Sequence, residues 1–469
     1  MSATAIELLP VPSSSIAEIP SLVAGLRTTF DSGRTRPLSW RRTQLEALLR
    51  FVKENGDALV AALQADLGKP ELEAWAADIG QVTTEAKLAL KNLKKWTRPE
   101  SAGAVPLMGK SFIMREPLGV VLIIAPWNYP IGLLLSPLVG AIAAGNTVVL
   151  KPSEVTAHTS AILAERLPDY LDTDAIALVE GGVPETSALL EQRFDHIMYT
   201  GNGSVAKVIM EAAAKNLTPI TLELGGKSPC IVDRTADLAV AARRIAWGKF
   251  MNAGQTCIAP DYILVEESIE EELIAELEKS VEEFYSGETQ ENPDYTRIVN
   301  SRHHERISQL MEGQEIAFGG ATRAEDCYIE PTVLRNVSPD SPIMQSEIFG
   351  PVLPVLRVKD VDEAIGFVNQ GEKPLALYLF SADASTEERV LSSTSSGGVT
   401  VNGTIMHLAN AKMPFGGVGP SGMGAYHGKH SFETFSHRKS VLRRGFRFDI
   451  KMMYPPYTKR RTEMAKKML

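Results

Sequence analysis

Between residues 119 and 151 the sequence reads GVVLIIAPWNYPIGLLLSPLVGAIAAGNTVVLK. Two apolar runs of strand length, at 120–124 and 147–150, flank a helix-like segment at 131–144. Fully apolar strands that alternate with helices are typical of a parallel sheet covered on both faces. The stretch therefore predicts an α/β fold, with ligands at the carboxyl ends of the strands.

The same stretch is long and apolar enough to raise the question of a membrane span. It is interrupted by three prolines and one asparagine, at Pro126, Asn128, Pro130 and Pro137. These breaks favour a strand, a turn and a buried helix over a spanning helix.

The alternation of strands and helices continues on both sides of this stretch. A helical pattern covers 19–96, with a break at Gly68-Lys69-Pro70, and residues 1–20 are expected to be extended. Further strands are expected at 176–180, 197–199 and 219–224. A second α/β region is expected after Leu224, with strands at 230–232, 262–265, 352–358, 376–380 and 398–401 and helices at 238–250, 269–285, 301–311 and 361–369.

Composition limits the class of protein. A chain of 469 residues is expected to form two or three domains. Its net charge of −9 argues against a nucleic-acid partner. The three cysteines suggest no disulfide framework, and no Lys or Arg precedes Arg27, so a reducing compartment, the cytoplasm, is expected.

Cys257 lies in the small-residue turn FMNAGQTCIAP at 250–260. A thiolate in a turn is an accessible nucleophile, although a free cysteine also serves as a small buried apolar residue. Cys230 falls in a predicted buried strand, and the charges of Glu325 and Asp326 are expected to raise the pKa of Cys327. Neither of these two cysteines is expected to be activated.

Polar residues follow several predicted strands. Asn128 has the amide of an oxyanion-hole donor, but it would equally suit a helix cap. Lys151 and Glu154 suit a sugar or phosphate group, or form an ordinary charged strand end. Residues 200–206, TGNGSVA, match the dinucleotide fingerprint G-x-G-x-x-G/A between a strand and a helix. The fingerprint alone would make Glu223 the ribose ligand. The glycine turn that follows it, Gly225-Gly226, equally suits a buried general base or a solvated acid at the end of a strand.

Six motifs in this order resemble the NAD(P)-dependent aldehyde dehydrogenase superfamily: PWN at 126–128, KPSE at 151–154, ELGGK at 223–227, GQTC at 254–257, EIFGP at 347–351 and PFGG at 414–417. The segments IAPDY at 258–262, GAYHG at 424–428 and YPPY at 454–457 resemble its class 3 branch, which includes fatty and aromatic aldehyde dehydrogenases.

The resemblance implies a role for each matching residue. Cys257 would be the nucleophile, Asn128 the oxyanion donor and Glu223 the base for thioester hydrolysis, which leaves the ribose to Lys151 and Glu154. The full cofactor set would be Trp127, Lys151, Glu154, Thr200, Gly201, Asn202, Val205, Leu224, Glu347 and Phe349. The substrate pocket would draw on Tyr129, Trp247, Met251, Thr256 and Phe432, some of which would serve equally as core residues. No metal is implied.

The resemblance also implies the reaction and the architecture. The enzyme would oxidise medium- or long-chain aliphatic or aromatic aldehydes to acids, with NAD and some use of NADP. A Rossmann-like NAD-binding domain (1–96 and 118–225) would join an α/β catalytic domain (226–420). A β-strand arm and tail (97–117 and 421–469) would form a homodimer. Ala206 replaces the family's usual glycine, and Gly203 is expected to loosen the same loop.

Two other classes of protein remain as alternatives, a cysteine hydrolase and a non-catalytic scaffold. The triad Cys257, Asn128 and Glu223 would also suit a cysteine hydrolase, although a hydrolase has no use for the fingerprint at Gly201; a non-catalytic scaffold has no use for the triad.

From Arg438 to Leu469 the chain contains eleven Lys or Arg and only two acids, Asp449 and Glu463, a local net charge of +9. This tail is either solvated, in contact with a partner subunit, or docked on an anionic membrane through Phe446, Phe448, Met452, Met453 and Tyr454.

Overall fold

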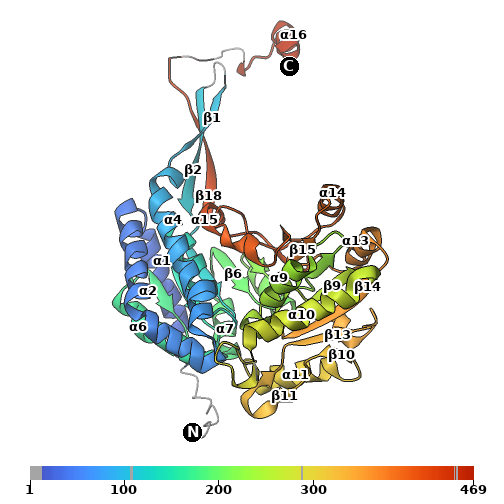
Figure 1. Cartoon of the computed structure of the whole chain (residues 1–469). Coiled ribbons are helices and arrows are strands. Elements are labelled where there is room, and N and C mark those ends of the chain that lie inside the picture. The colour runs from blue at the N-terminus through green and yellow to red at the C-terminus, as the bar shows by residue number, and fades with distance from the viewer. Residues whose placement is uncertain (1–12, 106–108, 287–288, 448, 450–452, 469) are drawn as a thin grey trace.

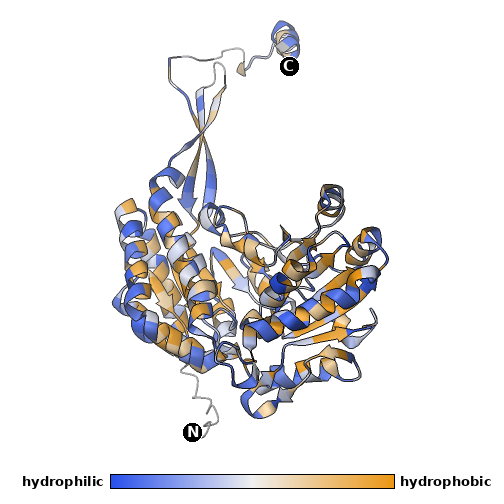
Figure 2. Cartoon of the chain, viewed as in Figure 1, coloured by the Kyte–Doolittle hydropathy of each residue, from blue (hydrophilic) through white to orange (hydrophobic). Residues whose placement is uncertain are grey.

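The computed structural model of the chain describes residues 13–105, 109–286, 289–447, 449 and 453–468. Its two large sheets contain six and seven strands, and a three-stranded sheet projects from the body (Figure 1). Figure 2 shows apolar strands surrounded by helices that carry both hydrophilic and apolar residues. This arrangement confirms the predicted α/β fold.

The six-stranded sheet has the order β17-β7-β6-β3-β4-β5. All neighbours run parallel except β17, which is antiparallel to β7. The strands from β3 to β7 agree closely with those predicted, whereas β17 lies in the glycine-rich segment that follows PFGG (414–417) and was not predicted. The bounds are β3 (Val120–Ile124), β4 (Thr147–Lys151), β5 (Ile176–Leu178), β6 (His196–Thr200), β7 (Ile220–Glu223) and β17 (Gly422–Met423).

Helices cover both faces of this sheet because alternate strand residues point to opposite sides. In β3, Val121 and Ile123 join one apolar cluster, while Val120 and Leu122 join another. The first cluster includes α2 (Leu38–Leu67), α4 (Gly80–Trp96), α5 (Gly132–Ala144) and α6 (Ala157–Arg166). The second includes α1 (Ile19–Asp31), α7 (Val183–Leu190) and α8 (Gly203–Ala214).

The seven-stranded sheet has the order β10-β13-β14-β9-β8-β15-β16, and all neighbours are parallel except β10 and β13. The predictions covered five of its strands and missed β10 and β13. The bounds are β8 (Pro229–Val232), β9 (Tyr262–Glu266), β10 (Glu315–Phe318), β13 (Thr332–Arg335), β14 (Val352–Val358), β15 (Ala376–Phe380) and β16 (Gly398–Val401). A separate hairpin pairs β11 (Thr322–Arg323) with β12 (Tyr328–Ile329).

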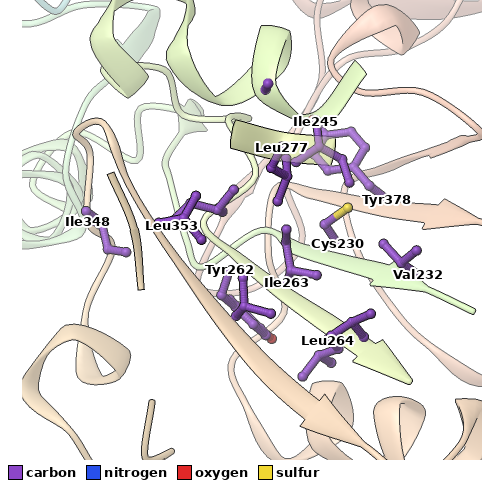
Figure 3. Packing of buried hydrophobic residues seen from close by; sticks show 14 of the residues in the cluster. Cys230, Val232, Ile245, Tyr262, Ile263, Leu264, Leu277, Ile348, Leu353 and Tyr378 are labelled. Carbon is purple, nitrogen blue, oxygen red and sulfur yellow. The ribbon is translucent and has the colours of Figure 1, made fainter. Parts of the chain in front are cut away.

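The core of this sheet contains Cys230 (Figure 3). Its side chain is fully buried with Ile263 and Tyr378, under Ile245 and Leu277 from two helices. Burial raises the pKa of the Cys230 thiol, so this cysteine is inert, as predicted. The surrounding helices are α9 (Leu238–Phe250), α10 (Glu270–Tyr285), α11 (Ser301–Met311), α12 (Pro342–Gln345), α13 (Val361–Gln370) and α14 (Ala384–Ser393).

The third sheet pairs β1 (Glu100–Val105), β2 (Gly109–Pro117) and β18 (Ser436–Arg443) in an antiparallel ribbon. It projects from the body, and α16 (Lys459–Met468) lies beyond its tip (Figure 1). Before β18, α15 (Gly428–Thr434) packs against α5 and α4. No helix within the described ranges combines the length and the apolar character that a membrane crossing requires.

Two local predictions were wrong. Residues 16–20 are helical, because η1 (Ile16–Glu18) leads directly into α1; residues 1–12 lie outside the described part of the chain. Gly203 does not loosen a loop, because it is the first residue of α8, whose N-cap is Asn202.

Candidate active site

The Cys257 turn follows α9 and the short helix η4 (Met251–Gly254). Three successive residues in it, Asn252, Ala253 and Gly254, have positive φ angles of 54°, 50° and 71°. A side chain at Gly254 would run into the main chain of Gly350, so this position requires glycine. The reversal of the chain leaves Cys257 half-buried at the end of the turn.

Asn128 lies in the loop between β3 and α5 and is buried. Its side-chain amide donates a hydrogen bond to the carbonyl of Gln255 at 3.0 Å. Its own carbonyl accepts bonds from Lys69 Nζ at 2.9 Å and from Asn252 Nδ2 at 3.1 Å. These bonds fix Asn128 relative to the turn that carries Cys257.

Glu223 is the last residue of β7, and its carbonyl accepts a hydrogen bond from Gly201 N at 3.0 Å. Its side chain is 2% exposed, and within the described residues neither carboxylate oxygen has a hydrogen-bond partner. Burial raises the pKa of Glu223 well above its usual range. An unpaired buried carboxyl group is costly, which is typical of a functional site.

The electrostatic environment links Cys257 to two carboxyl groups. Burial, followed by the charges of Glu347 and Glu223, raises the pKa of Cys257 to about 12, while the N–H groups of Cys257 and Ile258 lower it. Tyr426 is affected by the same groups, because burial and the charges of Glu223 and Cys257 raise its pKa. Cys257 and Glu223 therefore lie in one neighbourhood, and the hydrogen bond to Gln255 O brings Asn128 to the same turn.

A cleft of about 620 Å³ opens next to this neighbourhood, lined by Asn202, Gly203, Gly225, Gly226 and Glu347. It meets the N-terminus of the 12-residue helix α8, which suits a phosphate group. A side chain at Gly225 would run into the Glu347 carboxylate, so this part of the cleft wall is formed by backbone without side chains. These features fit a dinucleotide.

The predicted residues around the fingerprint lie at the end of β6, at the start of α8 and directly after β7. Thr200 ends β6 and is buried. The Asn202 side chain accepts a bond from Val205 N at 2.9 Å and so caps the helix. Val205 is 38% exposed, whereas Leu224 is buried and its N–H bonds Ser421 O at 3.1 Å.

Lys151 ends β4, with Nζ bonded to Pro152 O at 2.7 Å and 3.9 Å from Glu154 Oε2. Burial lowers its pKa, and the charges of Glu154, Glu185 and Glu180 oppose this shift. Glu180 and Glu185 were not predicted as site residues. The available signal was the position of Glu180 at the carboxyl end of the strand predicted at 176–180.

Glu347 and Phe349 lie between α12 and β14 of the seven-stranded sheet, next to the end of the six-stranded sheet that carries Trp127. The Phe349 ring packs edge-on against Trp127, with centroids 5.3 Å apart. Burial raises the pKa of Glu347 to about 8, helped by Asp261. The His303 ring also packs against Trp127, with ring centroids 5.2 Å apart. His303 was not predicted, because nothing in its local sequence distinguishes it.

The predicted substrate residues do not all come together. Tyr129 Oη and Thr256 Oγ1 are 2.6 Å apart beside the Cys257 turn. Met251 packs against the core of the second sheet, and Trp247 is 41% exposed. Phe432 is fully buried against Trp96, with ring centroids 5.7 Å apart, so its place is in the core.

The described residues include no group of three or more His, Cys, Asp or Glu side chains arranged to hold a metal ion. A sequence profile described as the Aldehyde dehydrogenase family matches residues 2–441. The chain belongs to the aldehyde dehydrogenase family. Aldehyde dehydrogenases are oxidoreductases that convert aldehydes to carboxylic acids with NAD or NADP, through a cysteine.

Similar proteins agree with this assignment. Aldehyde dehydrogenase family 3 member A2 of Mus musculus is 53% identical over 448 residues, 95% of this chain and 93% of the relative. The "Aldehyde dehydrogenase, dimeric NADP-preferring" of Mus musculus is 51% identical over 445 residues, 94% and 98% of the two chains. The structure of Staphylococcus aureus AldH in a substrate-bound state has a TM-score of 0.94 at 45% identity and covers 96% of this chain and 99% of that one.

Proposed function

We propose that the oxidation of aldehydes by this chain takes place at Cys257, with Asn128 and Glu223 as its partners. The observation that carries the proposal is the Asn128 amide bonded to the carbonyl of Gln255, two residues before the cysteine. The Cys257 thiolate attacks the aldehyde carbon and forms a C–S bond, and the carbonyl electron pair moves to oxygen. The free N–H of the Asn128 amide and the backbone N–H of Cys257 hold this oxyanion.

Bound NAD(P) would supply the acceptor for the hydride of the thiohemiacetal carbon on Cys257. The product on Cys257 is a thioester, which water must cleave. Deprotonated Glu223 takes a proton from that water as its oxygen adds to the thioester carbon. The C–S bond then breaks, which releases the acid and regenerates the thiolate.

The proposed cofactor site divides into three parts. Lys151 and Glu154 hold the adenosine ribose, and the start of α8 with Thr200, Gly201, Asn202 and Val205 holds the pyrophosphate. Trp127, Leu224, Glu347 and Phe349 surround the nicotinamide end. The charges of Glu154, Glu180 and Glu185 around Lys151 oppose a 2′-phosphate, so we propose NAD as the preferred cofactor, with some use of NADP.

The substrate is proposed to be a medium- or long-chain aliphatic or an aromatic aldehyde. Tyr129 and Thr256 lie beside the turn, and Met251 and Trp247 belong to the segment that leads into it. Their apolar surface suits an apolar aldehyde. Phe432 is left out of this pocket because it is a core residue.

We further propose that residues 1–96 and 118–225 form the NAD-binding domain and 226–420 the catalytic domain. The arm would join two subunits, since β1 and β18 are the edges of a projecting three-stranded sheet and can each add a strand of a second chain. The relative named as dimeric supports a homodimer.

The basic C-terminal tail bears on where the enzyme is located in the cell. The tail carries a local net charge of +9, and its helix α16 presents lysines and arginines beside the exposed Met464. Phe446, Met453 and Tyr454 are also exposed, whereas Phe448 and Met452 lie outside the described residues. We propose a cytoplasmic enzyme whose tail contacts anionic membrane surfaces.

The direct test follows NADH by absorbance with aldehydes from acetaldehyde to hexadecanal and with benzaldehyde. The wild-type chain should produce NADH, Cys257→Ala should produce none, and the matched variant Cys327→Ala should keep wild-type activity. Equal activity of Cys257→Ala would refute the proposed site. Acid release from esters without NADH from any aldehyde would favour a hydrolase.

A further inference from the structure

Three charged side chains are buried or half-buried in the short segment that joins α2 to α4. This segment contains α3 (Glu71–Glu73) and the π-helix η2 (Ala74–Ile79). The side chains of Lys69 and Asp78 are 0% exposed, and Glu73 is half-buried. Buried charges are costly and persist where they are paired or hydrogen-bonded, and π-helical turns are frequent at functional sites.

Lys69 points into the loop that carries Asn128. Its Nζ donates a hydrogen bond to the Asn128 carbonyl at 2.9 Å and lies 4.2 Å from the centre of the Tyr129 ring. Its counter-ion Asp78 is 3.6 Å away, longer than a hydrogen bond. The ammonium group therefore makes its closest contact with the peptide of the proposed oxyanion donor.

The same segment is hydrogen-bonded both to the loop that carries Asn128 and to the turn that carries Cys257. Asp78 Oδ1 accepts a hydrogen bond from Gly132 N, where the Asn128 loop enters α5. Glu73 Oε2 accepts bonds from Asn252 N at 3.0 Å and from Thr296 Oγ1 at 3.3 Å. Because Asn252 precedes Cys257 in the same turn, residues 69–79 connect the two halves of the oxyanion hole.

We infer that Lys69 is a positioning residue for the Asn128 amide, an inference that rests on the proposed function. The Asn128 carbonyl accepts donors from Lys69 and from Asn252, which together fix the orientation of its peptide. The side-chain amide is held on the other side by Gln255 O. Oxyanion stabilisation depends steeply on donor position, so loss of the Lys69 contact lets the amide drift.

The test removes both buried charges at similar volume, in the variant Lys69→Met/Asp78→Asn. The asparagine can still accept from Gly132 N, and removing the pair avoids an uncompensated charge. We expect kcat to fall about 10- to 100-fold, with KM for NAD within about twofold of wild type. Asp78→Asn alone keeps the Lys69–Asn128 bond and leaves Glu73 as the remaining carboxylate whose charge acts on Lys69. Its kcat per folded enzyme should stay within about threefold of wild type.

A double-mutant cycle separates positioning from general damage. In an Asn128→Ala background, Lys69→Met/Asp78→Asn should cost no more than about twofold in kcat, because the amide it positions is already absent. Equal losses in both backgrounds would overturn the inference. An Asn128→Ala variant with wild-type kcat would overturn the inference and the proposed oxyanion role together. Loss in Asn128→Ala with none in Lys69→Met/Asp78→Asn would overturn the inference alone.

A further variant covers the case in which the charge-free pair does not fold. Lys69→Arg keeps a cation and an N–H donor at the Asn128 carbonyl. A kcat within about fivefold of wild type, with an unchanged thermal midpoint, supports the inference. A large loss of kcat at an unchanged thermal midpoint, equal in the presence and absence of Asn128, contradicts it.

Discussion

The side-chain amide of Asn128 donates a hydrogen bond to the main-chain carbonyl of Gln255 at 3.0 Å. Asn128 follows a strand of the six-stranded sheet, whereas Gln255 belongs to the turn that enters the seven-stranded one. The bond occupies one N–H of the amide, and within the described residues the second N–H makes no hydrogen bond, so it can serve a ligand. It also sets the amide at a fixed place relative to Cys257.

Replacement of Asn128 by alanine should lower kcat by about 10²- to 10³-fold, because one oxyanion donor is lost. Cofactor affinity, measured by fluorescence titration with NADH, should stay within about twofold. Asn92→Ala is a matched control, since Asn92 also donates to a main-chain carbonyl, that of Leu88. A similar loss in both variants would contradict the assigned role.

Glu223→Gln should slow thioester hydrolysis by about 10²- to 10⁴-fold while the first hydride transfer persists. Rapid mixing should then show a burst of NADH close to one equivalent per site, followed by slow turnover. A large loss of NAD binding would instead favour the ribose role that the fingerprint alone suggested. Glu85→Gln, at another buried carboxyl group, is the control for general destabilisation.

Thiol reactivity should rise steeply with pH in the cofactor-free enzyme. The pKa of Cys257 is raised to about 12, so its reactive thiolate is the minor form at neutral pH and grows as pH rises. Alkylation by iodoacetamide, followed by peptide mass spectrometry, should accelerate at Cys257 from pH 6 to 9. Cys230 should remain unmodified because it is buried.

Glu347→Gln should change this pH dependence in one direction only. The pKa of Glu347 is raised to about 8, so its carboxyl group is largely neutral below that pH and charged above it. Its charge raises the pKa of Cys257, so the variant should react faster than wild type above pH 8 and alike below. A rate difference that is largest at pH 6 would contradict this assignment.

Glu154→Gln should shift the cofactor preference towards NADP. Loss of one carboxylate near Lys151 removes repulsion of a 2′-phosphate and a partner of the ribose diol. We expect the ratio of kcat/KM for NADP to that for NAD to rise about tenfold, a difference of about 1.4 kcal/mol. Glu165→Gln, at an exposed acid beside α6's Arg166, should leave the ratio unchanged.

Deletion of residues 446–469 should abolish sedimentation with phosphatidylserine vesicles but keep aldehyde oxidation. The deletion leaves β18 intact, since that strand ends at Arg443. Each Lys or Arg near an anionic surface contributes about 1 kcal/mol, and salt should weaken the binding of the full chain. Equal sedimentation of both chains would exclude the tail as the contact.

The sequence predicted those parts of the fold and site in which local pattern and tertiary role coincide. Largely apolar runs became β3, β4, β9 and β15, which are buried along their whole length. Cys257, Asn128 and Glu223 each lie at a glycine- or proline-rich break after a regular element, which marked them as candidates. Their local chemistry left other roles open, and only the resemblance across six motifs predicted a catalytic role for each one.

Other elements depend on contacts that no local pattern encodes. Strand β10 is partly exposed, and β1 lies on a projecting ribbon, so neither has an apolar run. Lys69 looked like a helix break after Gly68, and only the fold brings it to the carbonyl of Asn128. His303 and Glu180 likewise reach the site by tertiary packing.

The pairing of β17 with β7 has a consequence for biosynthesis. Gly422 lies opposite Glu223, so β7 gains its second neighbouring strand only after every strand of the seven-stranded sheet has been translated. A ribosome must therefore release residues 224–421 before the strand that bears Glu223 acquires both neighbours. Until then that edge of the sheet is open to pairing with other strands, which is an aggregation hazard for the nascent chain.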